Sequence, residues 1–157
     1  MHPTRHRFTI SPEIQGRIAG GDLRLLVSSG LPVMEDAAPF SPISDPRIVG
    51  QFLLFCGSPR VVQLGLNVET GEVVAIWPWA PPCFANSSLS LYADSITAFA
   101  EGLPYDADEE GYPDNILAQA DGLRRRIAQI DPPALGDNTF WNEISWDVVN
   151  GEWSSED

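Results

Sequence analysis

The sequence has no lysine, and only two of its 157 residues are cysteines and two are histidines. Cys56 and Cys83 are too few for a disulfide framework and too far apart for a metal-binding knuckle, so we expect Cys56 to be a buried free thiol. His2 and His6 lie within residues 1–10, which we predict to form a flexible N-terminal tail. A catalytic triad would need that tail to fold back onto the core, and the lack of a nearby carboxylate weighs against a metal site. The residues therefore indicate no catalytic group, no metal and no enzyme activity.

Long apolar runs are missing too. The longest, residues 73–85, is interrupted by three prolines and falls short of the roughly 18–20 residues that a membrane helix needs. No apolar segment follows the positive charges at the N-terminus, so we predict no secretion signal and expect a cytoplasmic protein. A glycine-rich phosphate loop leading into a lysine-bearing helix is also absent, and we predict no cofactor.

Acidic residues, by contrast, are abundant. The chain has 22 Asp and Glu against nine Arg, which gives a formal net charge of −13, and residues 101–157 hold 14 of these acidic residues and three of the arginines. Such a surface repels DNA, RNA and anionic membranes and raises the encounter rate with basic proteins. We therefore expect a basic protein partner and neither nucleic-acid nor membrane binding. The alternative is that the charge serves only solubility.

Apolar periodicity predicts strands in the first half of the chain. A short helical face at residues 23–27 comes first and ends at Gly30, as glycine-terminated helices do. Residues 51–56 are predicted to form a buried strand, and residues 61–68 a strand with one face on the core. Residues 73–77 return as its hairpin partner and, being apolar on both faces, are predicted to lie inside the sheet.

The second half of the chain shows three apolar stripes at helical spacing. The first follows Asn86 and Ser87, either of which can cap a first turn. The second begins near Asp114 and stops before Pro132, and the third runs from about residue 138 to 149. The stripes consist of Leu89, Tyr92, Ile96, Phe99 and Leu103; Ile116, Ala120, Leu123, Ile127 and Ile130; and Trp141, Ile144 and Val148. This order predicts an α+β fold, with residues 1–157 forming a single domain in which a mainly antiparallel sheet is packed with helices.

Two groups of residues are candidates for binding a partner. The first is an acidic segment between the first two long helices, made up of Asp106, Asp108, Glu109, Glu110 and Asp114. Its start imitates a calcium-binding loop, but Leu117 occupies the twelfth position, where such loops carry Glu, which favours a solvated connector or a partner-binding loop. The second group is Trp77 and Trp79, because tryptophans bracketed by prolines either cap a core or anchor an interface.

Four short motifs together resemble a known family. They are Ser29-Gly30-Leu31-Pro32 after a short helix, Phe52-Leu53-Leu54-Phe55 leading to Gly57, Asn67-Val68-Glu69-Thr70-Gly71-Glu72-Val73 at the hairpin, and Asn86-Ser87-Ser88-Leu89 at a helix start. In this order they resemble the SUKH superfamily of bacterial immunity proteins, especially the actinobacterial-type group with a D-x-x-T-G-x-V hairpin and an N-S-S-L helix start. Asn67 stands where Asp is commoner in that group. The motif residues themselves are interpreted as structural, since Gly71 fits a turn and Ser87 a cap.

The resemblance implies an α+β fold and a non-enzymatic role, the binding and neutralisation of a polymorphic toxin that is commonly a nuclease or a nucleic-acid deaminase. The acidic charge agrees with this role, because an inhibitor of such a toxin must cover a basic cleft, and carboxylates can take the place of phosphates there. A housekeeping interaction module of the same fold with no toxin partner is the alternative. A small enzyme is disfavoured by the lack of a visible base, nucleophile or metal cluster.

Overall fold

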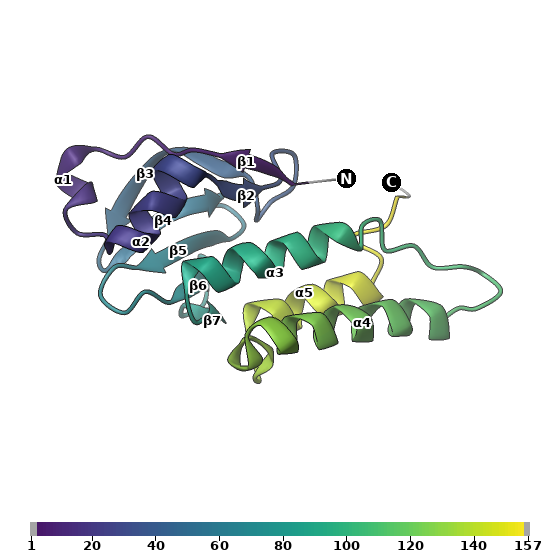
Figure 1. Cartoon of the computed structure of the whole chain (residues 1–157). Helices are drawn as coiled ribbons and strands as arrows, with labels where there is room; N and C mark the ends of the chain where they lie inside the picture. Colours follow the sequence, from purple (N-terminus) through teal and green to yellow (C-terminus); the bar gives the residue numbers. More distant parts are fainter. Residues whose placement is uncertain (1–2, 156–157) are drawn as a thin grey trace.

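The computed structural model describes residues 3–155 and has a five-stranded sheet, a two-stranded sheet and a set of helices (Figure 1). In the larger sheet the strands are neighbours in chain order, and each pairs antiparallel with the next. They are β3 (Pro42–Val49), β4 (Phe52–Gly57), β5 (Gln63–Asn67), β6 (Val73–Ile76) and β7 (Cys83–Asn86). The predicted α+β fold with a mainly antiparallel sheet is confirmed.

Sequence periodicity located three of these five strands. The predicted strands 51–56, 61–68 and 73–77 correspond to β4, β5 and β6, and β6 lies inside the sheet, between β5 and β7. The edge strand β3 escaped prediction because it contains Pro42 and Pro46, and proline is tolerated only at sheet edges and bulges. The pairing of β3 with β4 indeed shifts register between Pro42 and Arg47. The other edge strand, β7, has only four residues and directly follows two prolines.

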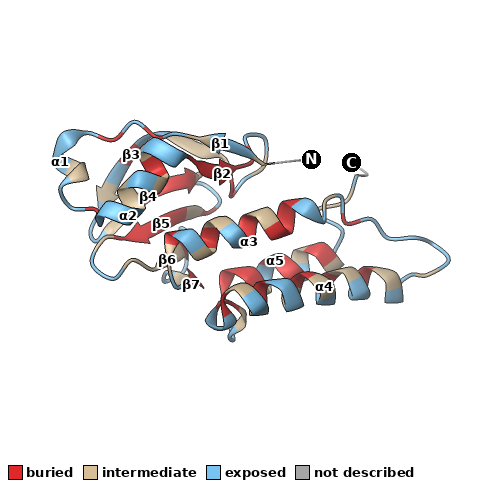
Figure 2. Cartoon of the chain, in the orientation of Figure 1, coloured by how far each residue is buried: buried red, intermediate tan, exposed pale blue. Residues whose placement is uncertain are grey.

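Three long helices form the other part of the molecule. They are α3 (Leu89–Glu101), α4 (Asp114–Ile130) and α5 (Phe140–Val149), and they correspond to the three predicted stripes. The helix α4 packs against both α3 and α5, while α3 and α5 also contact β7. Figure 2 shows buried residues along the facing sides of these helices and along β4 and β5. The shorter helices are α1 (Pro12–Gln15), α2 (Gly20–Arg24), a π-helical turn (Leu25–Ser29) and a 3₁₀ helix (Pro132–Leu135).

The N-terminal segment differs from its prediction. Residues 1–10 were expected to be a flexible tail, but β1 (Thr4–His6) pairs antiparallel with β2 (Leu31–Val33), and Phe8 and Ile10 are buried in the core. The expectation is therefore wrong for residues 4–10, while residues 1 and 2 lie outside the described residues. The physical reason is long-range pairing. A strand of three residues needs a neighbouring strand to supply hydrogen bonds, and here the partner of Arg5 is Pro32, 27 residues along the chain. His6 of the predicted tail thus belongs to a sheet.

The hairpin motif between β5 and β6 is a structural device. The side-chain oxygen Oδ1 of Asn67 accepts hydrogen bonds from the backbone N–H groups of Glu69 (3.0 Å) and Thr70 (3.2 Å). Asp and Asn both present an oxygen at this point, which explains why Asn67 can stand where Asp is commoner. Gly71 has a φ of +83°, a left-handed conformation that glycine adopts without strain.

A buried polar network joins the sheet to the three helices. Asn86, at the end of β7, is fully buried; its amide donates to Ser95 Oγ (3.0 Å) and to Asp131 Oδ2 (3.1 Å). The side-chain oxygen Oδ1 of Asn86 accepts a hydrogen bond from the indole N–H of Trp141 at 2.8 Å. Asp131 also accepts from the backbone N–H and the hydroxyl of Ser87, both at 2.7 Å. Asn86 and Ser87 therefore serve this network, and Ser88 caps α3 by accepting from the N–H of Leu91.

Candidate partner-binding surfaces

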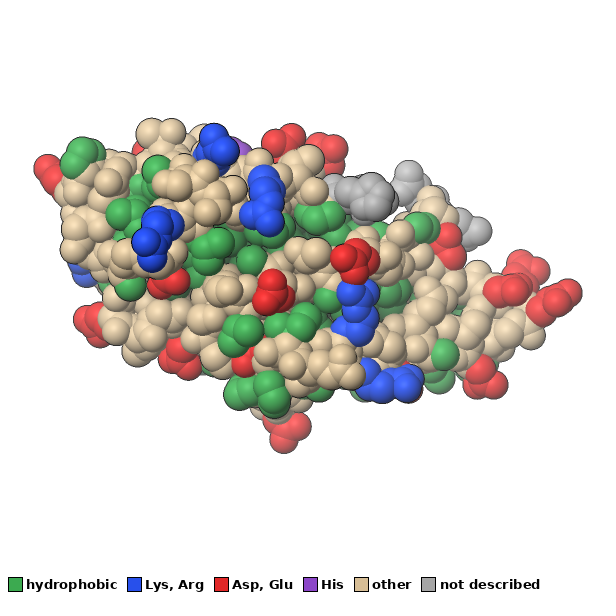
Figure 3. All heavy atoms as spheres, viewed as in Figure 1, with side chains coloured by type: hydrophobic (Ala, Val, Ile, Leu, Met, Phe, Trp, Pro, Cys, Tyr) green, Lys and Arg blue, Asp and Glu red, His purple; other side chains and the backbone are tan. Residues whose placement is uncertain are grey.

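The acidic segment occupies the loop between α3 and α4, which projects from the end of the molecule that is farthest from the sheet (Figure 1). Figure 3 shows acidic side chains gathered at this tip. All five carboxylates predicted for partner binding are exposed: Asp106, Asp108, Glu109, Glu110 and Asp114. None of them forms an ion pair with a described arginine. Their charge is thus available to a partner.

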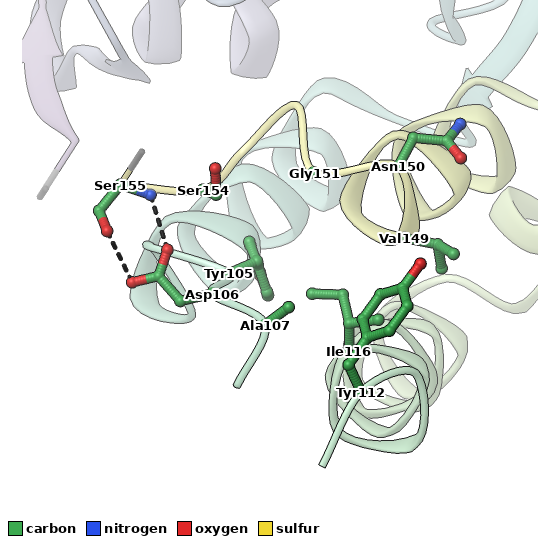
Figure 4. Close-up of a pocket in the computed structure, with 10 residues that line it drawn as sticks. All are labelled: Tyr105, Asp106, Ala107, Tyr112, Ile116, Val149, Asn150, Gly151, Ser154 and Ser155. Carbon is green, nitrogen blue, oxygen red and sulfur yellow. Dashed lines mark hydrogen bonds between the residues drawn. The ribbon is translucent and has the colours of Figure 1, made fainter. Parts of the chain in front are cut away.

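Asp106 differs from the other four, because it fastens the C-terminal segment to the loop. Its carboxylate accepts hydrogen bonds from the backbone N–H (2.7 Å) and the hydroxyl (2.8 Å) of Ser155, as Figure 4 shows. These two bonds lower the pKa of Asp106 below its usual value. A cavity of about 360 Å³ lies beside this contact, with Tyr105 and Tyr112 among its lining residues. We therefore separate Asp106, which holds the C-terminal segment, from the other four carboxylates, of which Asp108 bonds only within the loop, to the backbone N–H of Glu110.

The two tryptophans play different parts. Trp77 is half-buried, packs against the core, and has its ring centroid 6.5 Å from that of Phe140. Trp79 is 73% exposed. Core capping and interface anchoring were alternatives for the pair, and the structure divides them, since Trp77 caps the core and Trp79 faces solvent.

Both tryptophans line a groove of about 690 Å³, here called the Trp79 groove. One wall is the connection between β6 and β7 with the start of β7, and the other is one side of α5 with the turn before it. The lining consists of Trp77, Trp79, Ala80, Pro81, Pro82, Cys83, Phe84, Asp137, Asn138, Thr139, Glu143 and Asp147. The groove thus combines an apolar wall with three carboxylates, and no arginine is among these lining residues.

The two predicted groups are not brought together. The acidic segment ends where α4 begins, while Asp137 follows the other end of that helix. A helix of 17 residues is about 25 Å long at 1.5 Å per residue. Sequence reasoning missed Asp137, Glu143 and Asp147 as neighbours of Trp79. The spacing of Glu143 and Asp147, four residues apart and so on one helical face, was the signal that could have found two of them.

Comparison with known protein families gives a match over most of the chain. The SUKH-4 immunity protein model matches residues 16–147, from before α2 to the last turns of α5. The chain belongs to the SUKH-4 immunity protein family. No curated protein and no solved structure matches the chain significantly. The residues of the Trp79 groove and the acidic segment lie inside the range matched by the SUKH-4 model, whereas β1 and Ser155 lie outside it.

Both cysteines of this SUKH-4 protein are protonated thiols at neutral pH. Burial raises the pKa of the Cys56 thiol well above its usual value and that of Cys83 to about 11, so neither is a thiolate near neutral pH. Within residues 3–155, no three His, Cys, Asp or Glu side chains are grouped so that they could hold a metal ion. No helix among those residues is long and apolar enough to span a membrane.

Asp147, in the Trp79 groove, has a raised pKa. Burial raises its pKa to about 6, and the nearby carboxylates of Glu152 and Glu143 add to the rise. The folded state therefore holds more protons than the unfolded state between about pH 4 and pH 6, so the free energy of unfolding falls as pH rises through that window. A shift of this size converts to about 3 kcal/mol for a fully buried group, which solvent screening at a half-buried site reduces to about 1 kcal/mol.

Replacement of Asp147 by Asn is accordingly expected to stabilise the protein at neutral pH and not in acid. At pH 7.5 the variant should unfold about 2–4 °C higher than the parent, because each kcal/mol shifts Tm by about that much in a chain of this size. At pH 4 the two proteins should melt together. Thermal unfolding followed by circular dichroism at both pH values checks this, with the exposed Asp36→Asn as control. An equal gain at both pH values would show that the carboxylate charge is not the cause.

Proposed function

We propose that this chain binds a cognate polymorphic toxin, of nuclease or nucleic-acid deaminase type, and neutralises it by protein–protein contact in the cytoplasm. The observation that carries the proposal is the match to the SUKH-4 immunity protein family over residues 16–147. Immunity proteins generally act by binding, without catalysis of their own. The raised pKa values of both thiols agree with that mode.

The distribution of charge supports a basic toxin as the partner. Nucleases and deaminases that act on nucleic acid hold phosphates in basic clefts, and exposed carboxylates can occupy those positions. The acidic segment projects from the molecule and has no described arginine to neutralise it. The formal net charge of −13 also opposes direct binding of the chain to DNA or RNA.

Growth of cells that produce the toxin domain tests the proposal directly. Co-production of the chain should restore growth, and the purified chain should form a complex with the toxin and abolish its activity in a stoichiometric titration. The chain alone should show no turnover in nuclease or deaminase assays. Protection that persists when no complex forms, or turnover by the chain itself, would contradict neutralisation by binding.

The acidic segment is expected to act on the rate of association. Since Asp106 already bonds Ser155, the informative variant changes the other four carboxylates: Asp108→Asn, Glu109→Gln, Glu110→Gln and Asp114→Asn. Exposed charge steers encounter, and its reach shrinks from about 10 Å at 0.1 M salt to about 3 Å at 1 M. We expect the variant to associate with the toxin about tenfold more slowly at low salt and to lose most of the salt dependence, as measured by stopped flow.

A charge-matched control separates local steering from net charge. Four exposed carboxylates of the N-terminal third, Glu13, Glu35, Asp36 and Asp45, are neutralised in the same way. The control should slow association far less than the loop variant. If both variants behave alike, only the net charge matters; if neither differs from the parent, the loop is a solvated connector.

A further inference from the structure

The Trp79 groove has the composition of a docking site. One of its walls carries Trp79, which is exposed and lies outside the hydrophobic core. Trp79 is 73% exposed and stands in a segment with three prolines, Pro78, Pro81 and Pro82. The last two line the groove. Proline restricts the backbone, so the segment that presents the indole has little backbone freedom to lose on binding. Behind it, Trp77 is held against Phe140 and forms a firm floor.

The opposite wall of the groove carries uncompensated negative charge. Asp137, Glu143 and Asp147 line the groove together with the two tryptophans, and none of them forms an ion pair with a described arginine. Burial is the main cause of the raised pKa values of Asp147 and Cys83, and the negative charge of Glu143 adds to both rises, which places Glu143 electrostatically close to both groups. Like charges gathered beside an aromatic surface destabilise the free protein. A cation placed between them and the indole relieves the repulsion and also gains from the ring face.

We propose that the Trp79 groove docks a protruding segment of the toxin that carries an arginine or lysine beside an apolar side chain. The apolar residue packs on Trp79 and the proline wall, and the cation lies against Glu143 and Asp147. This inference rests on the proposed function and specifies where that binding occurs. A second copy of this chain is a poor occupant, because two chains of formal charge −13 repel each other. A nucleic acid is excluded by the same sign of charge.

Two groove variants and two matched controls test the docking site with the toxin domain. Trp79→Ala, and separately Glu143→Gln with Asp147→Asn, should each raise the Kd at least tenfold, as expected at a central aromatic anchor and its charged partners. Trp146→Ala removes a tryptophan that is 49% exposed but lies outside the groove. Glu35→Gln with Asp36→Asn removes two exposed charges elsewhere. Both controls should change the Kd less than threefold.

The outcomes distinguish this inference from the proposed function. If the parent binds and inhibits the toxin, and the groove variants bind as tightly as the controls, the docking site is wrong while neutralisation stands. If the parent itself neither binds nor protects, the proposed function fails, and the groove is then judged with a defined probe that needs no toxin.

That probe is the peptide acetyl-Leu-Arg-Leu-amide, compared with its neutral analogue containing citrulline in place of arginine. The indole N–H signals of the protein, with Trp79 assigned by its loss in Trp79→Ala, are followed by NMR during titration. We expect a saturable shift of the Trp79 signal with the arginine peptide at millimolar concentration, at least fivefold weaker binding of the citrulline peptide, and no shift of Trp146. No shift, or equal binding of both peptides, would overturn the inference. A Trp79 signal that moves with protein concentration alone would identify a second copy as the occupant instead.

Discussion

Replacement of Asp131 by Ala is expected to lower the free energy of unfolding by about 3–4 kcal/mol, since hydrogen bonds to a charged group contribute about 1.5–3 kcal/mol each. The Asp131 carboxylate is 2% exposed and accepts three hydrogen bonds, from the amide of Asn86 and from the N–H and hydroxyl of Ser87. Alanine removes all three acceptor contacts and leaves the buried Asn86 amide with Ser95 as its remaining partner. Urea unfolding followed by tryptophan fluorescence measures the loss.

Two further substitutions calibrate the Asp131 result. Asp131→Asn keeps the shape and one carbonyl oxygen, so we expect it to cost about half as much as alanine. Asp121→Ala removes an exposed carboxylate that forms an ion pair with Arg124, and it should cost less than about 0.5 kcal/mol. A loss below about 1 kcal/mol for Asp131→Ala would mean that water replaces the network and that Asn86-Ser87 is not a structural joint.

Replacement of Gly57 by Ala is expected to have a still larger effect and to leave the chain largely unfolded at 37 °C. Gly57 ends β4 with a φ of +99°, and a Cβ atom there would lie 2.1 Å from the carbonyl oxygen of Val62 and 2.8 Å from Cα of Gln63. Both are backbone atoms, one just before β5 and one at its first residue, so neither can turn away as a side chain could. We expect the free energy of unfolding to fall by more than about 4 kcal/mol, a loss that single substitutions cause only through a severe clash or backbone strain of this kind.

Gly50→Ala provides the matched control for Gly57→Ala. Gly50 also has a positive φ, +64°, but a Cβ atom at this residue meets nothing within 4 Å. Its substitution therefore reports backbone strain alone, about 1–2 kcal/mol. Thermal unfolding of both variants gives the comparison, and similar losses for the two would show that β4 and β5 separate easily enough to remove the clash.

Pattern alone predicted most of the regular structure. The 3.6-residue stripes of α3, α4 and α5 and the apolar strands β4, β5 and β6 are local signals, because each depends on residues a few positions apart. The motif resemblance led to the family for a similar reason: Asn67 and Gly71 serve the local backbone, Asn67 by accepting from the N–H groups of Glu69 and Thr70 and Gly71 by its positive φ. Such requirements can be recognised along the chain without knowledge of what packs against it.

Long-range contacts decided the rest. The strand β1 and the burial of Phe8 depend on segments far along the chain. So does the role of Asn86, which was expected to cap a helix and instead bonds Asp131, 45 residues away. The same holds for the candidate surfaces, where α4 keeps the acidic segment apart from Trp79 and α5 places Glu143 and Asp147 beside it. The sequence by itself determined the three long helices, the strands β4, β5 and β6, the acidic charge and the family. Only the tertiary structure decided which carboxylates line a groove with Trp79 and which one binds the C-terminal segment, because these are distances between residues that no local spacing specifies.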